Sequence, residues 1–193
     1  MICSNLENRG GTLFFGGADT TELIEKYGSP LYVMDEARIR HNCRVYLNAL
    51  REHLGETARP LYASKAASFK RVYEIMREEG MGIDVVSCGE IYTAYRAGYP
   101  LANAYFHSNN KTDADIEYAM DANIGYFVVD NIEELDAIAK IAARRSLPVL
   151  KLPLPVIRTA TVTMSVMYVL PICAPTTSPL QFPERPLPVR KAA

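Results

Sequence analysis

Several absences narrow the function of this 193-residue sequence before any motif is considered. The formal net charge is only −1, so the basic surface that a nucleic-acid partner requires is missing. The N-terminus has neither a basic start nor an apolar run, and the least polar stretch, residues 162–172, is shorter than the roughly 20 residues that cross a bilayer. The four cysteines form no CxxC pair, which is typical of reduced thiols. We therefore expect a cytoplasmic protein with no metal site, nucleic-acid partner or membrane partner.

The composition changes abruptly near Leu150. Residues 151–193 contain no glycine, one acidic residue and eight of the 12 prolines, whereas residues 1–150 contain every glycine. The first part has a net charge of −5 and the second a net charge of +4. We therefore expect a folded body at residues 1–150 and a proline-rich, extended or disordered tail at residues 151–193. A shifted reading frame explains this change better than a genuine proline-rich extension or a short β-rich segment.

Short apolar runs alternate with helical patterns through the body. The runs that predict strands lie at residues 31–34, 61–64, 82–86, 104–107, 125–129 and 147–152. From the second onward they begin about every 22 residues. Helix-capping pairs lie between them: Ser87 with Glu90, Thr112 with Asp115, and Asn131 with Glu134. This alternation predicts a parallel sheet whose short apolar strands are covered on both faces.

A doubly wound sheet and a (β/α)₈ barrel both fit this pattern. No GxGxxG or GxxxxGK[ST] segment follows a strand, so a nucleotide-binding sheet has no motif to support it. The regular spacing favours the barrel, although a complete barrel needs eight strands and roughly 250 residues. The predicted fold is therefore α/β, an incomplete (β/α)₈ TIM-type barrel with about six of the eight strands.

Polar residues stand where consecutive predicted strands end, and ligands bind there in parallel α/β folds. These residues are Lys65, Asp84 and His107. Small and apolar neighbours would partly desolvate the Lys65 amine, which suits a lysine that forms a Schiff base. Each of these residues also has a simpler explanation: Lys65 as an exposed loop lysine, Asp84 as a turn residue, and His107 as a histidine bonded to backbone. Helix capping alone likewise explains Ser87 and Glu90. The pattern predicts a lysine-centred site without specifying a reaction.

Four segments, in the right order, resemble the diaminopimelate decarboxylases, which are fold-type III pyridoxal-phosphate enzymes of the alanine racemase class. The segments are residues 16–20 together with 27–36, 62–66 (YASKA), 84–90 (DVVSCGE) and 106–112 (FHSNNKT). The last three are similar to the family's Y-A-x-K, D-x-x-S-x-x-E and F-H-G-N-N-K-[ST] motifs, with Ser108 in place of the usual glycine. The resemblance runs from about Phe15 to Leu150 and covers only the N-terminal part of the family.

The resemblance implies a pyridoxal 5'-phosphate enzyme that converts meso-diaminopimelate to L-lysine and CO₂, the last step of lysine biosynthesis. Lys65 would be the catalytic residue and would carry the cofactor as a Schiff base. The cofactor-binding residues would be Lys65, Asp84, Glu90 and His107, and the substrate pocket would include Ser87 and Asn109. A full-length family member would bind a small amino-acid substrate and form a homodimer.

After Leu150 the resemblance ends. The family's glycine-rich phosphate loop, the histidine that stacks on the cofactor and the C-terminal β-domain have no counterpart in residues 151–193. We therefore expect a truncated chain that releases no CO₂ by itself. The alternatives are a non-catalytic fragment, a stand-alone pyridoxal-phosphate-binding barrel, and a related ornithine- or arginine-type decarboxylase.

Overall fold

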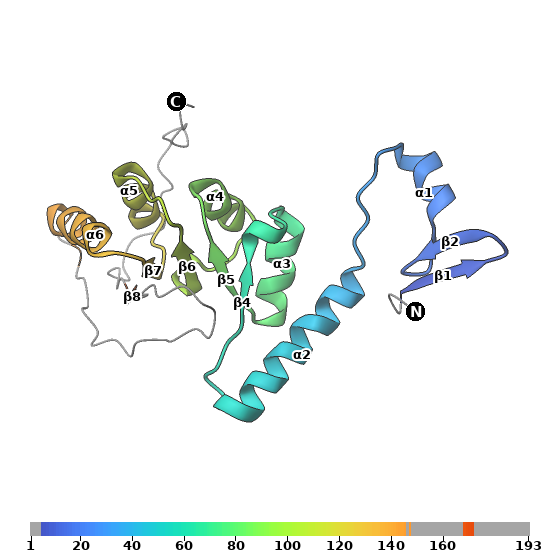
Figure 1. Cartoon of the computed structure of the whole chain (residues 1–193), viewed down its shortest axis with the longest axis horizontal. Coiled ribbons are helices and arrows are strands. Elements are labelled where there is room, and N and C mark those ends of the chain that lie inside the picture. The colour runs from blue at the N-terminus through green and yellow to red at the C-terminus, as the bar shows by residue number, and fades with distance from the viewer. Residues whose placement is uncertain (1–4, 146, 148–167, 172–193) are drawn as a thin grey trace. The chain divides into compact units, whose positions relative to one another are not determined.

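The computed structural model describes residues 5–145, 147 and 168–171 (Figure 1). The chain forms two compact units, of which the first ends at Ala58 and the second begins at Arg59. The predicted boundary at residue 150 and most of the predicted tail lie outside the described residues. The frame-shifted or disordered tail therefore stays a prediction.

The first unit combines a small antiparallel sheet with two helices. In chain order its elements are β1 (Leu6–Arg9), β2 (Thr12–Phe15), β3 (Ala18–Asp19), α1 (Thr20–Tyr27) and α2 (Glu36–Leu54). Asp35 begins α2, because its Oδ1 accepts a hydrogen bond from the Arg38 N–H at 3.1 Å. Its Oδ2 accepts a second bond from Asn5 Nδ2 at 3.0 Å. One carboxylate thus ties the start of the helix to the residue before β1.

The strand predicted at residues 31–34 is wrong. These residues run without regular structure between α1 and α2, and Tyr32 is 98% exposed. A β-branched or aromatic run becomes a strand only when a neighbouring strand supplies hydrogen bonds, and no described strand pairs with this segment. Most of the strand predicted at residues 147–152 lies outside the described part of the chain.

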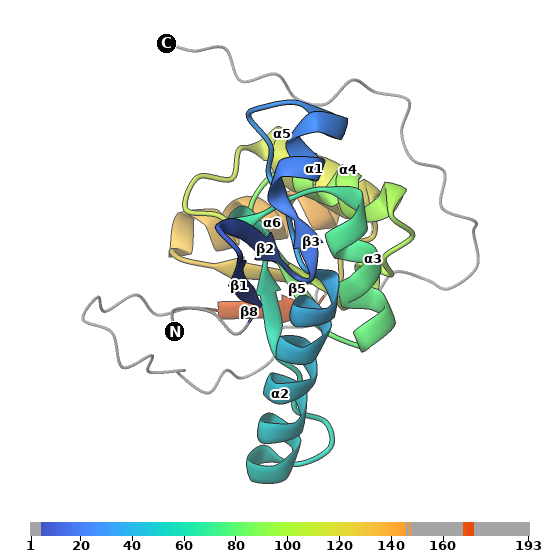
Figure 2. The same cartoon turned by 90° about the vertical axis from the view of Figure 1, so that its right-hand side faces the viewer.

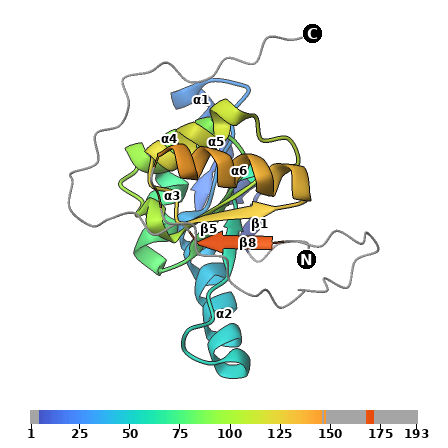
Figure 3. The same ribbon diagram turned by 90° about the vertical axis from the view of Figure 1, so that its left-hand side faces the viewer.

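The second unit is a five-stranded sheet with helices on one face. Its strands are β4 (Leu61–Ala63), β5 (Gly82–Val85), β6 (Ala104–His107), β7 (Tyr126–Val129) and β8 (Tyr168–Pro171). Its helices are α3 (Lys70–Glu79), α4 (Cys88–Arg96), α5 (Asp113–Asp121) and α6 (Ile132–Arg144), with short 3₁₀ turns η1 (Ser64–Ala66) and η2 (Leu101–Asn103). Figures 1 and 3 show α4, α5 and α6 on the same face of the sheet. The predicted α/β fold is confirmed, and the described strands form an open sheet.

The edge strand β8 departs from the parallel order of the sheet. Strands β4 to β7 pair in parallel, whereas β8 pairs with β7 in the antiparallel direction, with Val169 opposite Val128. It is the orange arrow in Figures 2 and 3. The described residues therefore contain four parallel strands, fewer than the six that the sequence predicts.

The parallel strands bury one face and leave the other partly exposed. The apolar strand residues that are at most 1% exposed are Ile83, Val85, Ala104, Phe106, Phe127 and Val129. On the other face Asp84, Tyr105, His107 and Tyr126 are only partly buried, whereas Val128 is 4% exposed. The expectation that both faces are covered is therefore wrong for the described part of the chain, because helices cover only one face. Of the polar candidates, Asp84 and His107 lie on the uncovered face.

The predicted capping pairs are confirmed at all three helix starts. The Ser87 hydroxyl accepts from the Glu90 N–H at the start of α4, and the Asn131 side chain accepts from the Glu134 N–H at the start of α6. At the start of α5, Thr112 and Asp115 form a complete reciprocal capping box.

Gly125 marks a close backbone approach just before β7. Its N–H donates to the Leu101 carbonyl at 3.0 Å, and a Cβ atom at this position would overlap the Ala102 carbonyl group. We expect Gly125→Ala to lower the free energy of unfolding by about 1–3 kcal/mol, because rigid backbone must move to admit the methyl group. At Gly89, by contrast, a Cβ atom meets nothing nearer than the Ser87 hydroxyl at 3.8 Å. Urea denaturation of Gly89→Ala should show unchanged or higher stability, and equal stability of the two variants would contradict the argument.

Candidate active site

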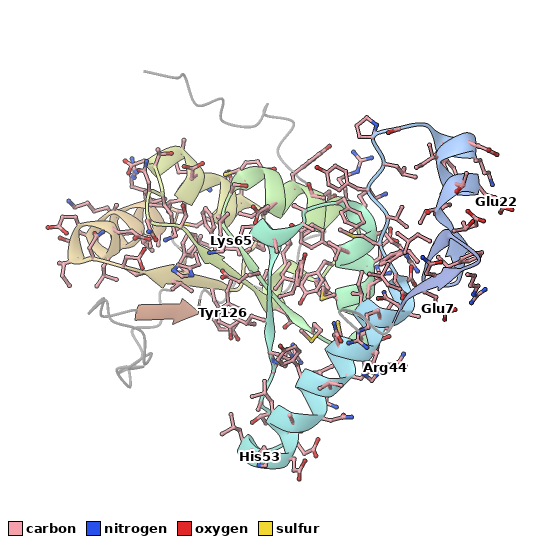
Figure 4. All side chains as sticks on the ribbon, turned by 45° about the vertical axis from the view of Figure 1, so that its right-hand side comes forward. Glu7, Glu22, Arg44, His53, Lys65 and Tyr126 are labelled. Carbon is pink, nitrogen blue, oxygen red and sulfur yellow. The ribbon has the colours of Figure 1, made fainter. Side chains whose placement is uncertain are left out.

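Five polar side chains gather at the carboxyl ends of the four parallel strands. Four of them, Lys65, Asp84, His107 and Asp130, belong to the ends of β4, β5, β6 and β7, and Glu90 lies in the first turn of α4. Figure 4 shows Lys65 beyond the end of β4. Because the carboxyl ends of parallel strands meet at one edge of a sheet, residues from different βα units converge there. We call these five residues the strand-end cluster.

The imidazole of His107 lies between two carboxylates. Its Nδ1 is 3.6 Å from Asp84 Oδ2, and its Nε2 is 3.8 Å from Asp130 Oδ1. Contact with Asp84 raises the pKa of His107, and the charge of Asp130 adds to this, while burial and the charge of Lys111 oppose it. The arrangement favours the charged imidazolium.

Each of these two carboxylates also has an unused oxygen atom. Asp84 Oδ1 and Asp130 Oδ2 are buried, and neither accepts a hydrogen bond from any described residue. Buried carboxylate oxygens are nearly always hydrogen-bonded in folded proteins. The two atoms therefore mark positions where a bound ligand or a water molecule would donate a hydrogen bond.

The charges of Lys65 and Asp84 both act on the pKa of Glu90. Its Oε2 accepts a hydrogen bond from the Val86 N–H at 2.9 Å. Burial raises the pKa of Glu90, the Val86 bond opposes this, the charge of Asp84 adds to it and the charge of Lys65 opposes it. Glu90 therefore takes up a proton more readily than an ordinary glutamate.

Lys65 is more accessible than the sequence predicts. It lies in η1, directly after the buried Ser64, and its own side chain is exposed. The expectation of a partly desolvated amine is therefore wrong, because the neighbouring alanines are too short to cover a lysine side chain.

The two residues predicted to line a substrate pocket, Ser87 and Asn109, lie in different kinds of local structure, a helix cap and an exposed bend. Ser87 Oγ accepts from the Glu90 N–H at 3.3 Å, so the helix-cap explanation describes its geometry. Asn109 is exposed in a bend after β6, and no described contact joins it to the strand-end cluster. Ser108, in place of the family's glycine, needs no left-handed backbone, because Asn123 is the only non-glycine residue with positive φ in the described ranges.

Asp130 is the cluster member that the sequence prediction missed. It directly follows the apolar run Tyr126–Val129, the same position relative to a strand that drew attention to Lys65. The strand-end rule could therefore have found it. Unlike Lys65, Asp130 belongs to none of the recognised sequence motifs.

A buried ion pair holds the end of β7 and the loop after β6 together. The Lys111 side chain is fully buried and its Nζ donates to Glu134 Oε1 at 2.5 Å. The same Nζ donates to the carbonyl oxygens of Ser108 and Val128, each at 2.8 Å. Glu134 Oε2 in turn accepts from the Asp130 N–H at 3.4 Å. This buried pair fixes the backbone on which His107 and Asp130 stand.

Comparison with known proteins assigns the chain to a family. The family described as "Pyridoxal-dependent decarboxylase, pyridoxal binding domain" matches residues 36–160. The chain therefore belongs to the pyridoxal-dependent decarboxylases.

Within that family it is similar to diaminopimelate decarboxylases. Those of Bacillus methanolicus and Halalkalibacterium halodurans are 48% and 45% identical over 139 and 138 residues, which are 72% of this chain and 32% and 31% of theirs. The solved diaminopimelate decarboxylase of M. jannaschii is 35% identical with a TM-score of 0.65, over 74% of this chain and 33% of its own. The lysine/ornithine decarboxylase of Vibrio vulnificus, solved with putrescine, is 29% identical with a TM-score of 0.57, over 64% of this chain and 33% of its own. The chain thus spans about a third of the length of these relatives.

The helices were also compared with the dimensions of a bilayer. Within residues 5–145, 147 and 168–171, no helix combines the length and the apolar character that a crossing requires.

The buried pair generates a stability prediction. We expect Lys111→Met to lower the free energy of unfolding by about 3–5 kcal/mol, because it leaves Glu134 buried without a counter-charge. Combining it with Glu134→Leu should recover part of that loss, since the uncompensated charge is then removed. Lys140→Met, on the exposed side of α6, should change stability by less than about 0.5 kcal/mol in the same urea titration. A loss at Lys140 equal to that at Lys111 would contradict the assignment.

Proposed function

We propose that this protein is a pyridoxal-phosphate-dependent decarboxylase of meso-diaminopimelate, with Lys65 as the residue that bonds the cofactor. The observation that carries the proposal is an accessible lysine amine at a strand end, within electrostatic range of Glu90 and beside a carboxylate-rich edge. The substrate assignment is supported by the names of the similar proteins. The M. jannaschii diaminopimelate decarboxylase was also solved in complex with L-lysine.

The donor set of the strand-end cluster fits the aldehyde end of pyridoxal phosphate. An exposed amine can form the covalent link, and the unused oxygens of Asp84 and Asp130 can accept hydrogen bonds from a bound group. When bound, the cofactor supplies an electron sink that stabilises the electron pair left by departing CO₂. The three carboxylates of the cluster would repel a phosphate dianion placed against them, so we assign the phosphate-binding groups to residues outside the cluster.

The residues of the chain then have separate tasks in the proposed reaction. Lys65 presents its amine as the nucleophile that bonds an aldehyde. Glu90 is held through Oε2 by the Val86 N–H, which leaves Oε1 to hold or pass on a proton near that amine. The raised pKa of Glu90 means that it binds a proton more readily than an ordinary glutamate, which suits a proton-transfer role. Asp84 contributes negative charge beside both Glu90 and His107.

Homodimer formation and a cytoplasmic location stay predictions of the sequence.

A second candidate is a protein that binds the cofactor without decarboxylating a substrate. The observation in its favour is β8, which pairs antiparallel with β7 where a (β/α) barrel needs a parallel neighbour. Both candidates share Lys65 and differ in turnover. CO₂ release from meso-diaminopimelate by the 193-residue chain is the observation that would separate them, because it would support the decarboxylase and contradict the second candidate.

Covalent trapping tests the role of Lys65. The full chain is incubated with pyridoxal phosphate and reduced with borohydride, and the labelled peptide is identified by mass spectrometry. We expect the phosphopyridoxyl label on Lys65, and its loss in Lys65→Ala and in Lys65→Arg, because a guanidinium does not form a Schiff base. The matched control Lys70→Ala removes another exposed lysine, and labelling of Lys65 should persist there. A label spread evenly over several lysines would show that Lys65 has no special role.

Amine exchange tests the substrate class without requiring turnover. An amino acid that enters the site takes the cofactor from the lysine, so its addition before borohydride should reduce labelling of Lys65. We expect meso-diaminopimelate to reduce labelling at lower concentration than ornithine or arginine. The opposite order would assign the site to the ornithine- or arginine-type relatives.

A further inference from the structure

The contacts of His107 point to an additional functional residue. We propose that Asp130 is a positioning residue of the site, which together with Asp84 holds the His107 ring between two carboxylates. Both ring nitrogens are then N–H donors, and His107 acts as a fixed cation rather than as a proton acceptor. The catalytic meaning of this role rests on the proposed function, whereas the arrangement itself does not.

The hydrogen-bonding capacity of imidazole depends on its protonation state. A neutral histidine has one N–H group and one nitrogen lone pair. In this structure each ring nitrogen faces a carboxylate oxygen, Asp84 Oδ2 at 3.6 Å and Asp130 Oδ1 at 3.8 Å. Whichever nitrogen of a neutral ring lacked its proton would direct a lone pair at a negative charge. Only the imidazolium presents a donor to both carboxylates.

Asp130 is held in place independently of His107. Its N–H donates to Glu134 Oε2, and Glu134 is bonded through its other oxygen to the buried Lys111. The next residue, Asn131, caps α6 by accepting from the Glu134 N–H at 2.8 Å. The carboxylate therefore projects from a backbone position that is fixed by a buried ion pair and by a helix start. Such a residue can orient a ring from a neighbouring strand.

Charged groups face His107 from three parts of the second unit. Asp84 comes from β5, Asp130 from the end of β7, and Lys111 from the loop after β6. The positive charge of Lys111 is already matched by Glu134 in the buried pair. Two carboxylates therefore act on the ring against one compensated ammonium group. The carboxylates dominate, so removing Asp130 should make the imidazolium easier to deprotonate.

The test is a histidine titration by proton NMR on the full chain without cofactor. The chain has only three histidines, and His107→Asn identifies the signal of His107. We expect Asp130→Asn to move the titration midpoint of His107 to lower pH, and Asp130→Glu to restore part of the shift. The control Asp136→Asn makes the same charge change at an exposed position of α6 and should leave the midpoint unchanged. An unmoved midpoint in Asp130→Asn, or an equal shift in Asp136→Asn, would overturn the proposal.

Stability measured against pH provides a second readout if Asp130→Asn is poorly folded at high pH. The folded-state pKa of His107 is raised, so its contribution to stability is fully present below the unfolded value of about 6.5 and is lost as pH rises through the raised value. We expect this pH-dependent loss in the natural chain to be smaller in Asp130→Asn and retained in Asp136→Asn. Equal pH dependence in all three proteins would overturn the proposal.

The two proposals can fail separately. Suppose that the titration midpoint of His107 shifts as expected but that pyridoxal phosphate and borohydride do not label Lys65 in the natural chain. The positioning role of Asp130 then stands and the decarboxylase function fails. If Lys65 is labelled while the midpoint stays fixed, the function stands and Asp130 has no positioning role.

Discussion

The strand-end cluster depends on the burial of one ion pair, Lys111 with Glu134. Burying two charges is costly unless every donor and acceptor is matched. Here the three N–H donors of the ammonium meet three oxygens, two from backbone carbonyls and one from Glu134. The carbonyls belong to the loop after β6 and to β7, and Glu134 belongs to α6. One buried side chain thus sets the spacing of the two strand ends that carry His107 and Asp130.

The same hydrogen-bond arrangement occurs at the starts of two helices, α4 and α6, but the two glutamates interact with different lysines. At α4 and at α6 a glutamate in the first turn bonds the backbone N–H of the residue before the helix cap, Val86 for Glu90 and Asp130 for Glu134. Glu134 is neutralised by a fully buried lysine. Glu90 instead interacts with Lys65, whose side chain is exposed. One βα unit is therefore locked by its lysine, while the other keeps its lysine available for chemistry.

Local pattern predicted the four parallel strands well, missed the edge strand β8, and predicted the site only in part. Strands β4 to β7 are predicted to within one residue, because each is an apolar run bounded by a glycine, a polar residue or a cap. Residues 31–34 fail because strand formation requires a partner strand, which composition does not reveal. The Lys111–Glu134 pair joins residues 23 positions apart through burial, so no local spacing announces it. Asp130 follows the strand-end rule and lacked only a motif to draw attention to it.

The charge of the strand-end cluster separates two tasks that a cofactor site must perform. Three carboxylates favour ammonium and N–H groups, and the two unused buried oxygens require such donors. These features suit the bonding of an aldehyde to Lys65 and the reception of an amino group. They oppose a phosphate dianion, which needs N–H groups or cations. Under the proposed function, attachment of the cofactor is a property of β4 to β7, whereas its firm retention, and with it turnover, depends on groups beyond the cluster.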